Sequence, residues 1–315
     1  MALGVGAWSG AAAEDAAYRQ SRDDAWWTGP ILAAGASTLP KGHFLVEPYV
    51  FDVISQGRYD DDGNRRGRPR RHALGSLTYV LYGLVDEVTV GVIPRFGYND
   101  VSTGADSSGV GLGDFTVQAA YRLAQFREGS RVPTMSVVLQ QSLPTGKFDR
   151  LGARPNDGLG SGAYTTTLSL YSQYFLWMPN GRILRTRLNF SYSVSDTVSV
   201  EDVSVYGTSD GFRGHARPGR SFVVGSAWEY SVTRNWVLAL DLVYQHDTST
   251  TLDGFDETNT RIQQDFGSSE VFTLAPAVEY NWNSRMGVIV GAVLTAAGRN
   301  ASATVVPVAA VNMVF

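Results

Sequence analysis

The feature that most constrains this chain is a two-residue alternation, seen clearly in residues 183–194, which read ILRTRLNFSYSV. Every second residue from Leu184 to Val194 is mostly apolar, whereas the residues between them are polar and include Arg185 and Arg187. Successive side chains of a β-strand point to opposite faces, so this segment is a strand with one apolar and one polar side. The fold must decide which side lies inside.

Similar alternation recurs along the chain and predicts twelve strands. Short turns join some of them, and longer polar loops join the others. An even number of long antiparallel strands with this alternation of connections is typical of an outer-membrane barrel. The sequence predicts an all-β fold, a transmembrane antiparallel β-barrel of 12 strands with short periplasmic turns and long extracellular loops. The expected strands are 43–54, 72–84, 88–100, 112–126, 133–146, 164–177, 183–196, 220–232, 236–250, 270–282, 286–298 and 304–315, and the expected long loops are 55–71, 101–111, 147–163, 197–219 and 251–269.

A soluble β-sandwich is the alternative fold, and the placement of aromatic residues argues against it. Aromatic rings gather at strand ends beside the short turns, as interfacial belts require. They include Tyr174, Trp177, Trp228, Tyr230, Trp236, Tyr280 and Trp282. On this interpretation the apolar faces meet lipid. An arginine facing lipid near the bilayer midplane costs about 2–4 kcal/mol, so Arg185 and Arg187 are expected to point inward.

The same alternation assigns further charged residues to the barrel interior. The expected pore-lining residues are Glu47, Arg95, Asp114, Arg122, Arg185, Arg187, Glu229, Asp241 and Glu279. Opposite charges fall on adjacent strands, with Arg95 beside Asp114 and Arg122, and with Arg185 and Arg187 beside Glu229. Such a mixed ring can select ions in a pore. It can equally be a salt-bridge network that fills a narrow barrel, since buried ions persist mainly when they are paired.

The residues before the first strand suggest three parts of the chain: a possible signal-peptide remnant (1–13), an N-terminal segment (14–42) and the barrel (43–315). Ala11–Ala13 before Glu14 resemble a signal-peptidase site, although a basic start is missing. Trp26 and Trp27 are not expected in a free tail, because exposed rings lose the favourable free energy of burying apolar surface. The segment is therefore expected to be a lumen plug whose tryptophans can stack on an aromatic solute. An interfacial anchor and a disordered tail are the alternatives.

The composition and the remaining motifs exclude several other functions. A net charge of −4 gives no case for nucleic acid, and the absence of cysteine excludes thiolate chemistry. The four histidines have no metal-ligand spacing, so neither a metal nor a cofactor is expected. The run GVGLGD is not followed by a helix, and DDDGN lacks the downstream glutamate of a calcium loop. The basic run RRGRPRRH (65–72) is expected either to meet lipopolysaccharide phosphates or to be a solvated loop.

The last expected strand, TVVPVAAVNMVF, ends in Phe315 and resembles the C-terminal signal through which the barrel assembly machinery recognises outer-membrane proteins. The signal usually has an aromatic residue where this chain has Met313. Pro307 cannot donate a ladder hydrogen bond, so a bulge or a strand end is expected there.

Three longer stretches carry a family resemblance. They are WWTGPILAAGASTLPKGHFLVEPYVFD (26–52), GVGLGDFTVQAAYRL (109–123) and QSLPTGKFDRLG (141–152). The chain resembles bacterial outer-membrane transporters of the "putative meta-pathway of phenol degradation" family. The resemblance implies a barrel that passes small, often aromatic or apolar molecules. Lys147, within LPTGK, is expected at the outer mouth of the barrel.

These observations together predict a channel in the outer membrane of a Gram-negative bacterium, contacting lipid and lipopolysaccharide and passing small molecules passively. Two other function classes stay open. One is a non-conducting structural or surface-interaction barrel. The other is an outer-membrane lipid hydrolase, for which His246 and Ser249 are the available base and nucleophile.

Overall fold

The computed structural model describes residues 19–101 and 104–315, and strands make up most of them. The expected signal-peptide remnant, 1–13, lies outside the described residues, as do residues 14–18. Within the described ranges, no helix is long and apolar enough to cross a membrane. The two short 3-10 helices are η1 (Arg22–Asp24) and η2 (Pro155–Asp157). The strands are β1 (Phe44–Tyr59), β2 (Arg65–Val85), β3 (Val88–Ile93), β4 (Arg95–Val101), β5 (Gly111–Leu112), β6 (Phe115–Ala124), β7 (Thr134–Leu143), β8 (Thr165–Trp177), β9 (Ile183–Ser195), β10 (Val198–Glu201), β11 (Arg213–Arg217), β12 (Ser221–Ser231), β13 (Trp236–Asp247), β14 (Thr251–Phe255), β15 (Arg261–Asp265), β16 (Ser269–Asn283), β17 (Met286–Arg299) and β18 (Ala301–Val314).

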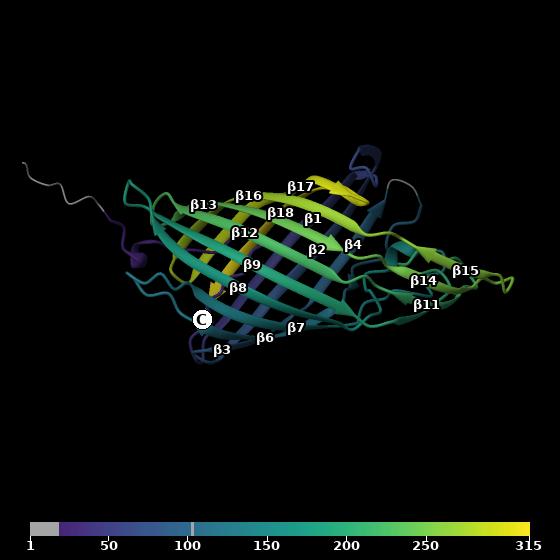
Figure 1. The fold of residues 1–315 in the computed structure, drawn as a ribbon, viewed down its shortest axis with the longest axis horizontal. Coiled ribbons are helices and arrows are strands. Elements are labelled where there is room, and N and C mark those ends of the chain that lie inside the picture. Colours follow the sequence, from purple (N-terminus) through teal and green to yellow (C-terminus); the bar gives the residue numbers. More distant parts are fainter. Residues whose placement is uncertain (1–18, 102–103) are drawn as a thin grey trace, which may run out of the picture.

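The larger sheet closes on itself, because β1 pairs with β18 on one side and with β2 on the other (Figure 1). This sheet contains 14 segments, but two pairs of them are halves of single barrel strands. Pro94 separates β3 from β4, and Gly113 and Asp114 separate β5 from β6. The barrel therefore has twelve antiparallel strands, and the predicted fold class is confirmed.

The two faces of the wall differ as the alternation requires. In β9, Arg185, Arg187 and Asn189 are buried, whereas Leu188 and Phe190 are exposed on the outside. Large apolar side chains are exposed around the barrel, including Val50, Leu74, Leu139, Leu168, Leu188, Leu238, Leu240, Val278 and Val290. In a transmembrane barrel these exposed groups face lipid tails, so the polar face of each strand is the inner one.

The two ends of the chain meet at the seam of the barrel. The backbone N–H of Phe315 donates to the carbonyl of Phe44 at 2.8 Å, and the Phe44 N–H donates back at 3.1 Å. The expectation of a bulge at Pro307 is wrong, since the pairs Phe51↔Val308 and Ile54↔Val305 keep one register across it. In an antiparallel ladder each N–H is directed at only one neighbouring strand, so a single proline removes one bond without shifting the register.

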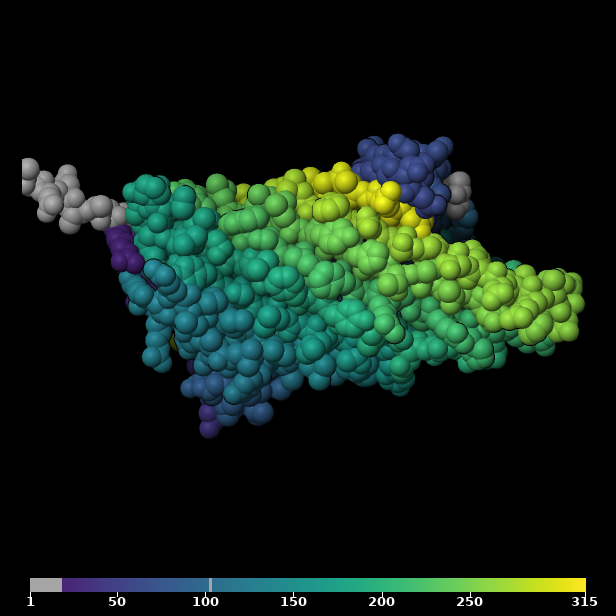
Figure 2. Space-filling view, viewed as in Figure 1, coloured from purple at the N-terminus to yellow at the C-terminus, as the bar shows by residue number. Residues whose placement is uncertain are grey.

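The outer end of the barrel is more ordered than the polar loops predicted there. β1 and β2 continue into residues 55–71 and leave only a short turn at 60–64. The expected loops 197–219 and 251–269 contain a second sheet, of order β10-β11-β14-β15. Val198, Val200, Phe212, Ala216 and Leu252 form its buried core. This extension projects beyond the barrel, and the β1–β2 hairpin stands apart from it (Figures 1 and 2).

Candidate functional site: the barrel lumen and the N-terminal segment

A cluster of charged side chains lies on the inner wall of the barrel, and we call it the charged centre (Arg185, Arg187, Glu229, Asp241 and Glu279). Glu229 on β12 accepts hydrogen bonds from Arg185 Nε at 2.7 Å and from Arg187 Nε at 3.0 Å. The second oxygen of Glu229 also contacts Arg185. Arg185 and Arg187 belong to the adjacent strand β9, and Glu229 is fully buried. The glutamate thus bridges two cations inside the barrel.

The other two carboxylates of the charged centre bind the backbone of the N-terminal segment, of which residues 19–42 are described. Glu279 Oε2 on β16 accepts hydrogen bonds from the N–H groups of Thr28, at 2.7 Å, and Gly29, at 3.1 Å. On β13, Asp241 accepts from Ile31 at 3.1 Å and from Ala33 at 2.9 Å. Backbone N–H groups of an extended segment otherwise have no partners, so the two carboxylates satisfy four of them.

The segment then follows the inner wall from β13 to β9, β7 and β3 and returns to the periplasmic end. Arg187 Nη1 donates to the carbonyl of Ala33 at 2.7 Å, and Asn189 Nδ2 donates to that of Ala34 at 3.0 Å. Ser136 on β7 contacts the carbonyl of Ala36. The backbone N–H of Leu39 donates to Thr89 Oγ1 at 2.8 Å, and that of Lys41 to Asp86 Oδ1 at 2.9 Å in the β2–β3 turn.

Small residues on the inner wall make room for this segment. A Cβ added at Gly287 on β17 would collide with Thr28 Oγ1, and one at Gly291 would lie 2.7 Å from Ile31 Cδ1. Ile31 packs against a buried cluster that contains Ala239, Ala277 and Ala310. Gly29 has a φ of +121°, which side-chain-bearing residues rarely adopt, and this allows the chain to turn beneath Arg187. The wall and the segment are therefore complementary in shape as well as in charge.

Aromatic side chains hold the start of the N-terminal segment against the barrel wall. Trp27 lies over the guanidinium of Arg185, at 4.5 Å from Cζ to the ring centroid, and packs edge-on against Phe175. Trp26 stacks with Arg234 in the β12–β13 turn, at 4.4 Å. Trp177 is expected in the interfacial belt beside the short turns, but it faces inward. Its Nε1 donates to the carbonyl of Gln20 at 2.9 Å, because alternation puts it on the same face of β8 as the buried Gln173 and Phe175.

Three of the expected pore-lining residues lie outside the charged centre. Arg122 lies 3.7 Å from Glu87 beside the β2–β3 turn. Asp114 accepts hydrogen bonds from Gly146 N at 3.1 Å and from Ser161 N at 2.7 Å, so it fastens the loop between β7 and β8. Arg95 lines an open pocket beside Asp114. Arg122 therefore lies apart from Arg95 and Asp114, which line the same pocket. Asp114 and Arg122 belong to one barrel strand, and the rise of about 3.3 Å per residue along a strand places them at different heights.

Of the remaining expected residues, one lies near the charged centre and one lies in an outer loop. Glu47 on β1 interacts with Asn312 and lies within electrostatic reach of Arg187. Lys147 is exposed in the outer loop, where its carbonyl accepts from the N–H groups of Leu159 and Gly160. Asp157, in the same loop, accepts from Ser108 N at 2.6 Å, and this hydrogen bond lowers the pKa of its carboxyl.

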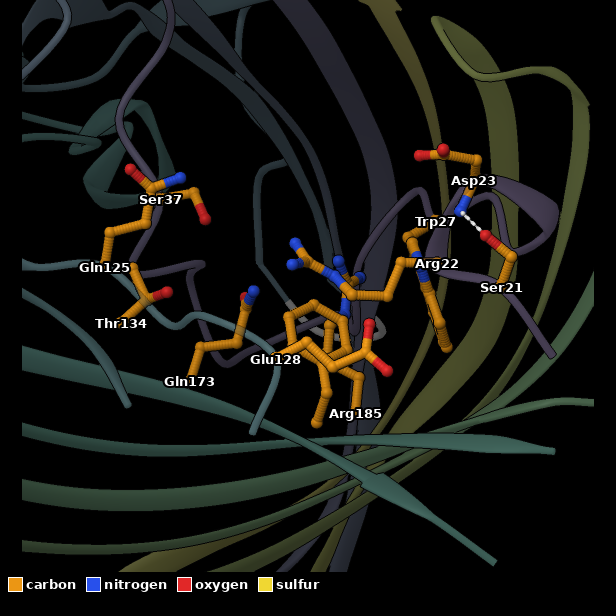
Figure 3. Close-up of a pocket in the computed structure, with 11 residues that line it drawn as sticks. Ser21, Arg22, Asp23, Trp27, Ser37, Gln125, Glu128, Thr134, Gln173 and Arg185 are labelled. Atoms are coloured by element: carbon orange, nitrogen blue, oxygen red, sulfur yellow. Dashed lines mark hydrogen bonds between the residues drawn. The ribbon is translucent and has the colours of Figure 1, made fainter. Parts of the chain in front are cut away.

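The segment separates two cavities of the lumen. The lower chamber, of about 500 Å³, opens toward the periplasmic end and is lined by Trp27, Gln173 and Arg185 among others (Figure 3). The upper chamber, of about 300 Å³, has Leu32, Ala33 and Ala34 of the segment on its lining. Figure 3 shows residues of the segment and of the barrel wall facing each other across the lower chamber.

The residues considered for catalysis have separate partners. His246 lies 3.7 Å from Glu270, whereas Ser249 contacts Asp265 and donates to the carbonyl of Thr250 at 3.2 Å. A hydrolase needs a serine hydroxyl hydrogen-bonded to its base. No cluster of acidic or histidine side chains in the part of the chain that the structure describes is suited to hold a metal ion.

Comparison with known proteins adds to this geometry. The family described as "Putative MetA-pathway of phenol degradation" matches residues 35–305. The chain belongs to this family. The resemblance carried by its three motifs is thus confirmed. No curated protein matches the sequence.

Solved structures provide a second comparison. A crystal structure of an outer membrane channel from Pseudomonas putida F1 superposes with a TM-score of 0.69 at 16% identity, covering 90% of this chain and all of that one. The β domain of the Bordetella autotransporter BrkA superposes with a TM-score of 0.48 at 11% identity, covering 87% of this chain and 100% of that one. The Ralstonia pickettii toluene transporter TbuX superposes with a TM-score of 0.37 at 11% identity, covering 88% of this chain and 90% of that one. The first of these shows that the barrel has an outer-membrane channel fold.

Replacing Asp241 with asparagine should loosen the segment without unfolding the barrel. The asparagine keeps one oxygen acceptor, but its NH2 group replaces the second oxygen that Asp241 offers to the N–H groups of Ile31 and Ala33. One of these N–H groups then has no acceptor, which costs about 1–3 kcal/mol. Planar-bilayer recordings should then show frequent transitions to a higher conductance level. Asp247→Asn, on the same strand but at its outer end, is the matched control and should record as wild type. Equal traces for both variants would mean that Asp241 does not hold the segment.

Proposed function

We propose that this chain is a channel of the bacterial outer membrane that takes up small, apolar or aromatic molecules passively. The observation that carries the proposal is a barrel lumen divided by an inserted segment into two chambers of a few hundred cubic ångströms. Chambers of this size suit single small molecules, and a lumen filled in this way is too narrow to act as a wide aqueous pore. Membership of the family supports the same conclusion. The proposal gives the chain a transport role and no catalytic one.

The N-terminal segment acts in this proposal as a plug. Its backbone is held by Asp241, Glu279, Arg187 and Asn189, so the charged centre serves chiefly as the attachment of the plug. Arg185 and Arg187 are both engaged by Glu229, which limits their part in ion selection. Trp27 adds an aromatic surface to the lower chamber, on which a planar solute can stack.

Two partners are part of the proposal. The β1–β2 hairpin carries Arg65, Arg66, Arg68, Arg70 and Arg71, all of them exposed at the outer end of the barrel. Guanidinium groups pair with phosphates in a bidentate manner, so we propose that this hairpin meets the phosphates of lipopolysaccharide. Phe315 is 65% exposed at the periplasmic end of the seam, where the barrel assembly machinery can recognise it.

The uptake proposal is tested in cells, because small aromatic molecules cross protein-free phospholipid vesicles unaided. A Gram-negative host without channels of this type, producing the full chain, should accumulate radiolabelled toluene at low concentration several times faster than cells carrying an empty vector. Proteoliposomes containing the chain should not swell in sucrose. Equal toluene uptake with and without the chain, at equal outer-membrane abundance, contradicts the proposal.

A further inference from the structure

The upper chamber has a divided lining. Leu32 of the segment and the inward-facing Val223, Val243 and Val293 supply apolar surface, whereas Asn189 and Tyr171 supply polar surface. Asn189 sits on β9 between Tyr171 of β8 and Gly225 of β12, its register partners on either side. The chamber thus presents a mostly apolar space with a few polar groups on one side, the usual composition of a small-molecule site.

The orientation of the Asn189 amide follows from its hydrogen bond. Its nitrogen lies 3.0 Å from the carbonyl oxygen of Ala34, and a carbonyl can only accept. The group that faces Ala34 must therefore be the NH2, which leaves Oδ1 as the remaining polar atom of the side chain. Asn189 is only 7% exposed, and its Oδ1 is buried with no hydrogen-bond partner. A buried acceptor of this kind costs free energy until a donor reaches it.

Two polar side chains near Asn189 are bonded to other partners, and a hollow lies beside the amide. Ser191, the next inward residue of β9, already shares a hydrogen bond with Ser169, at 2.8 Å between the two oxygens. Gln245 directs its NH2 to the carboxylate of Asp247 at 2.9 Å. Directly across from Asn189, a Cβ added at Gly225 would meet only Val243 Cγ2, at 3.5 Å. The glycine therefore keeps a hollow beside the amide.

We propose that the upper chamber is a binding site for a small apolar solute that carries one hydroxyl group, and that Asn189 Oδ1 accepts the hydrogen bond of that hydroxyl. The proposal rests on the passive uptake proposed above and names the solute preference of the same lumen. The valines and Leu32 bind the apolar body, while the hydroxyl satisfies the acceptor that the fold leaves unpaired. A solute without a donor fits the same space but leaves Oδ1 unsatisfied, so it binds more weakly.

The test compares three solutes of nearly equal size that differ at one group. Fluorine NMR would measure the saturable binding of 4-fluorophenol, 4-fluoroanisole and 4-fluorotoluene to the full chain in lipid nanodiscs, with partitioning into empty nanodiscs subtracted. One neutral hydrogen bond corresponds to about a 3- to 10-fold difference in affinity. 4-Fluorophenol should bind more tightly by this factor. The anisole, which has an oxygen but no donor, should behave as the toluene does.

Two variants test whether the preference for the phenol depends on Asn189 and whether binding takes place in the upper chamber. Asn189→Ala should bring the affinities for the phenol and the toluene to within about twofold of each other. Gly225→Leu fills the hollow and should remove saturable binding of all three solutes. Asn312→Ala, another inward-facing asparagine outside the chamber, is the control and should preserve the preference. A phenol preference that persists in Asn189→Ala, or binding that survives Gly225→Leu, overturns the inference. Toluene uptake by cells tests the channel function separately, so a chain that transports toluene without preferring phenol refutes only this site.

Discussion

A chain lacking residues 19–38 should form a folded barrel whose single-channel conductance is several-fold higher than that of the full-length protein. These residues occupy the lumen against β7, β9, β13 and β16, and their removal joins the two chambers into one passage. The barrel strands keep all of their ladder pairings, because the segment belongs to neither sheet. Asp241 and Glu279 lose backbone donors, but water entering the opened lumen can solvate them. Planar-bilayer recording measures the change.

A control experiment must show that the deletion variant still folds into a barrel. Unboiled samples of both chains should migrate differently from boiled ones on a denaturing gel, which shows that each barrel is intact. A deletion variant that shows this shift but conducts as the full-length chain does would contradict the assignment of the segment as a plug.

Replacing Glu229 with leucine should destabilise the protein more than any other single charge removal at the charged centre. Two buried guanidinium groups would lose the carboxylate that they share, and leaving a buried charge uncompensated costs about 3–5 kcal/mol. The free energy of unfolding in urea, measured in lipid vesicles, reports the loss. Glu128→Leu is the matched control, because its pair with Arg19 is more than half exposed and such pairs contribute little.

A second variant distinguishes lost charge pairing from a misfit side chain. Replacing Arg185, Arg187 and Glu229 together with methionine, methionine and leucine removes the whole ion-paired unit, and stability should recover much of the loss. If the triple variant is as unstable as Glu229→Leu, poor packing rather than unpaired charge explains the effect.

The parts of this structure that follow from local chemistry could be predicted from the sequence. Alternation is a local property, so it assigned Arg185, Arg187 and Glu229 to the inner face, where their side chains are buried. A closed barrel follows because each strand in lipid must pair its polar backbone on both sides. The strand number follows from counting the alternating segments. The two adjacent tryptophans suggested a plug or an anchor, and Trp26 and Trp27 stack with Arg234 and Arg185.

Features that depend on distant parts of the chain could not be predicted. The sheet formed by β10, β11, β14 and β15 requires two separate polar loops to pair, and each strand has only four or five residues. The acceptor at Asn189 arises only because Ala34, remote in sequence, occupies its amide nitrogen.

The N-terminal segment leaves the biosynthetic machinery before any barrel strand, yet its partners are among the last to be made. Thr28 is 251 residues from Glu279, and Ile31 is 210 residues from Asp241. Contacts of such long sequence separation form only after the loop between them has closed, which slows their formation. We therefore expect the wall to assemble around a lumen that is still vacant, with the first residues synthesised docking among the last to complete folding. An assembling barrel consequently passes through a transiently unsealed stage.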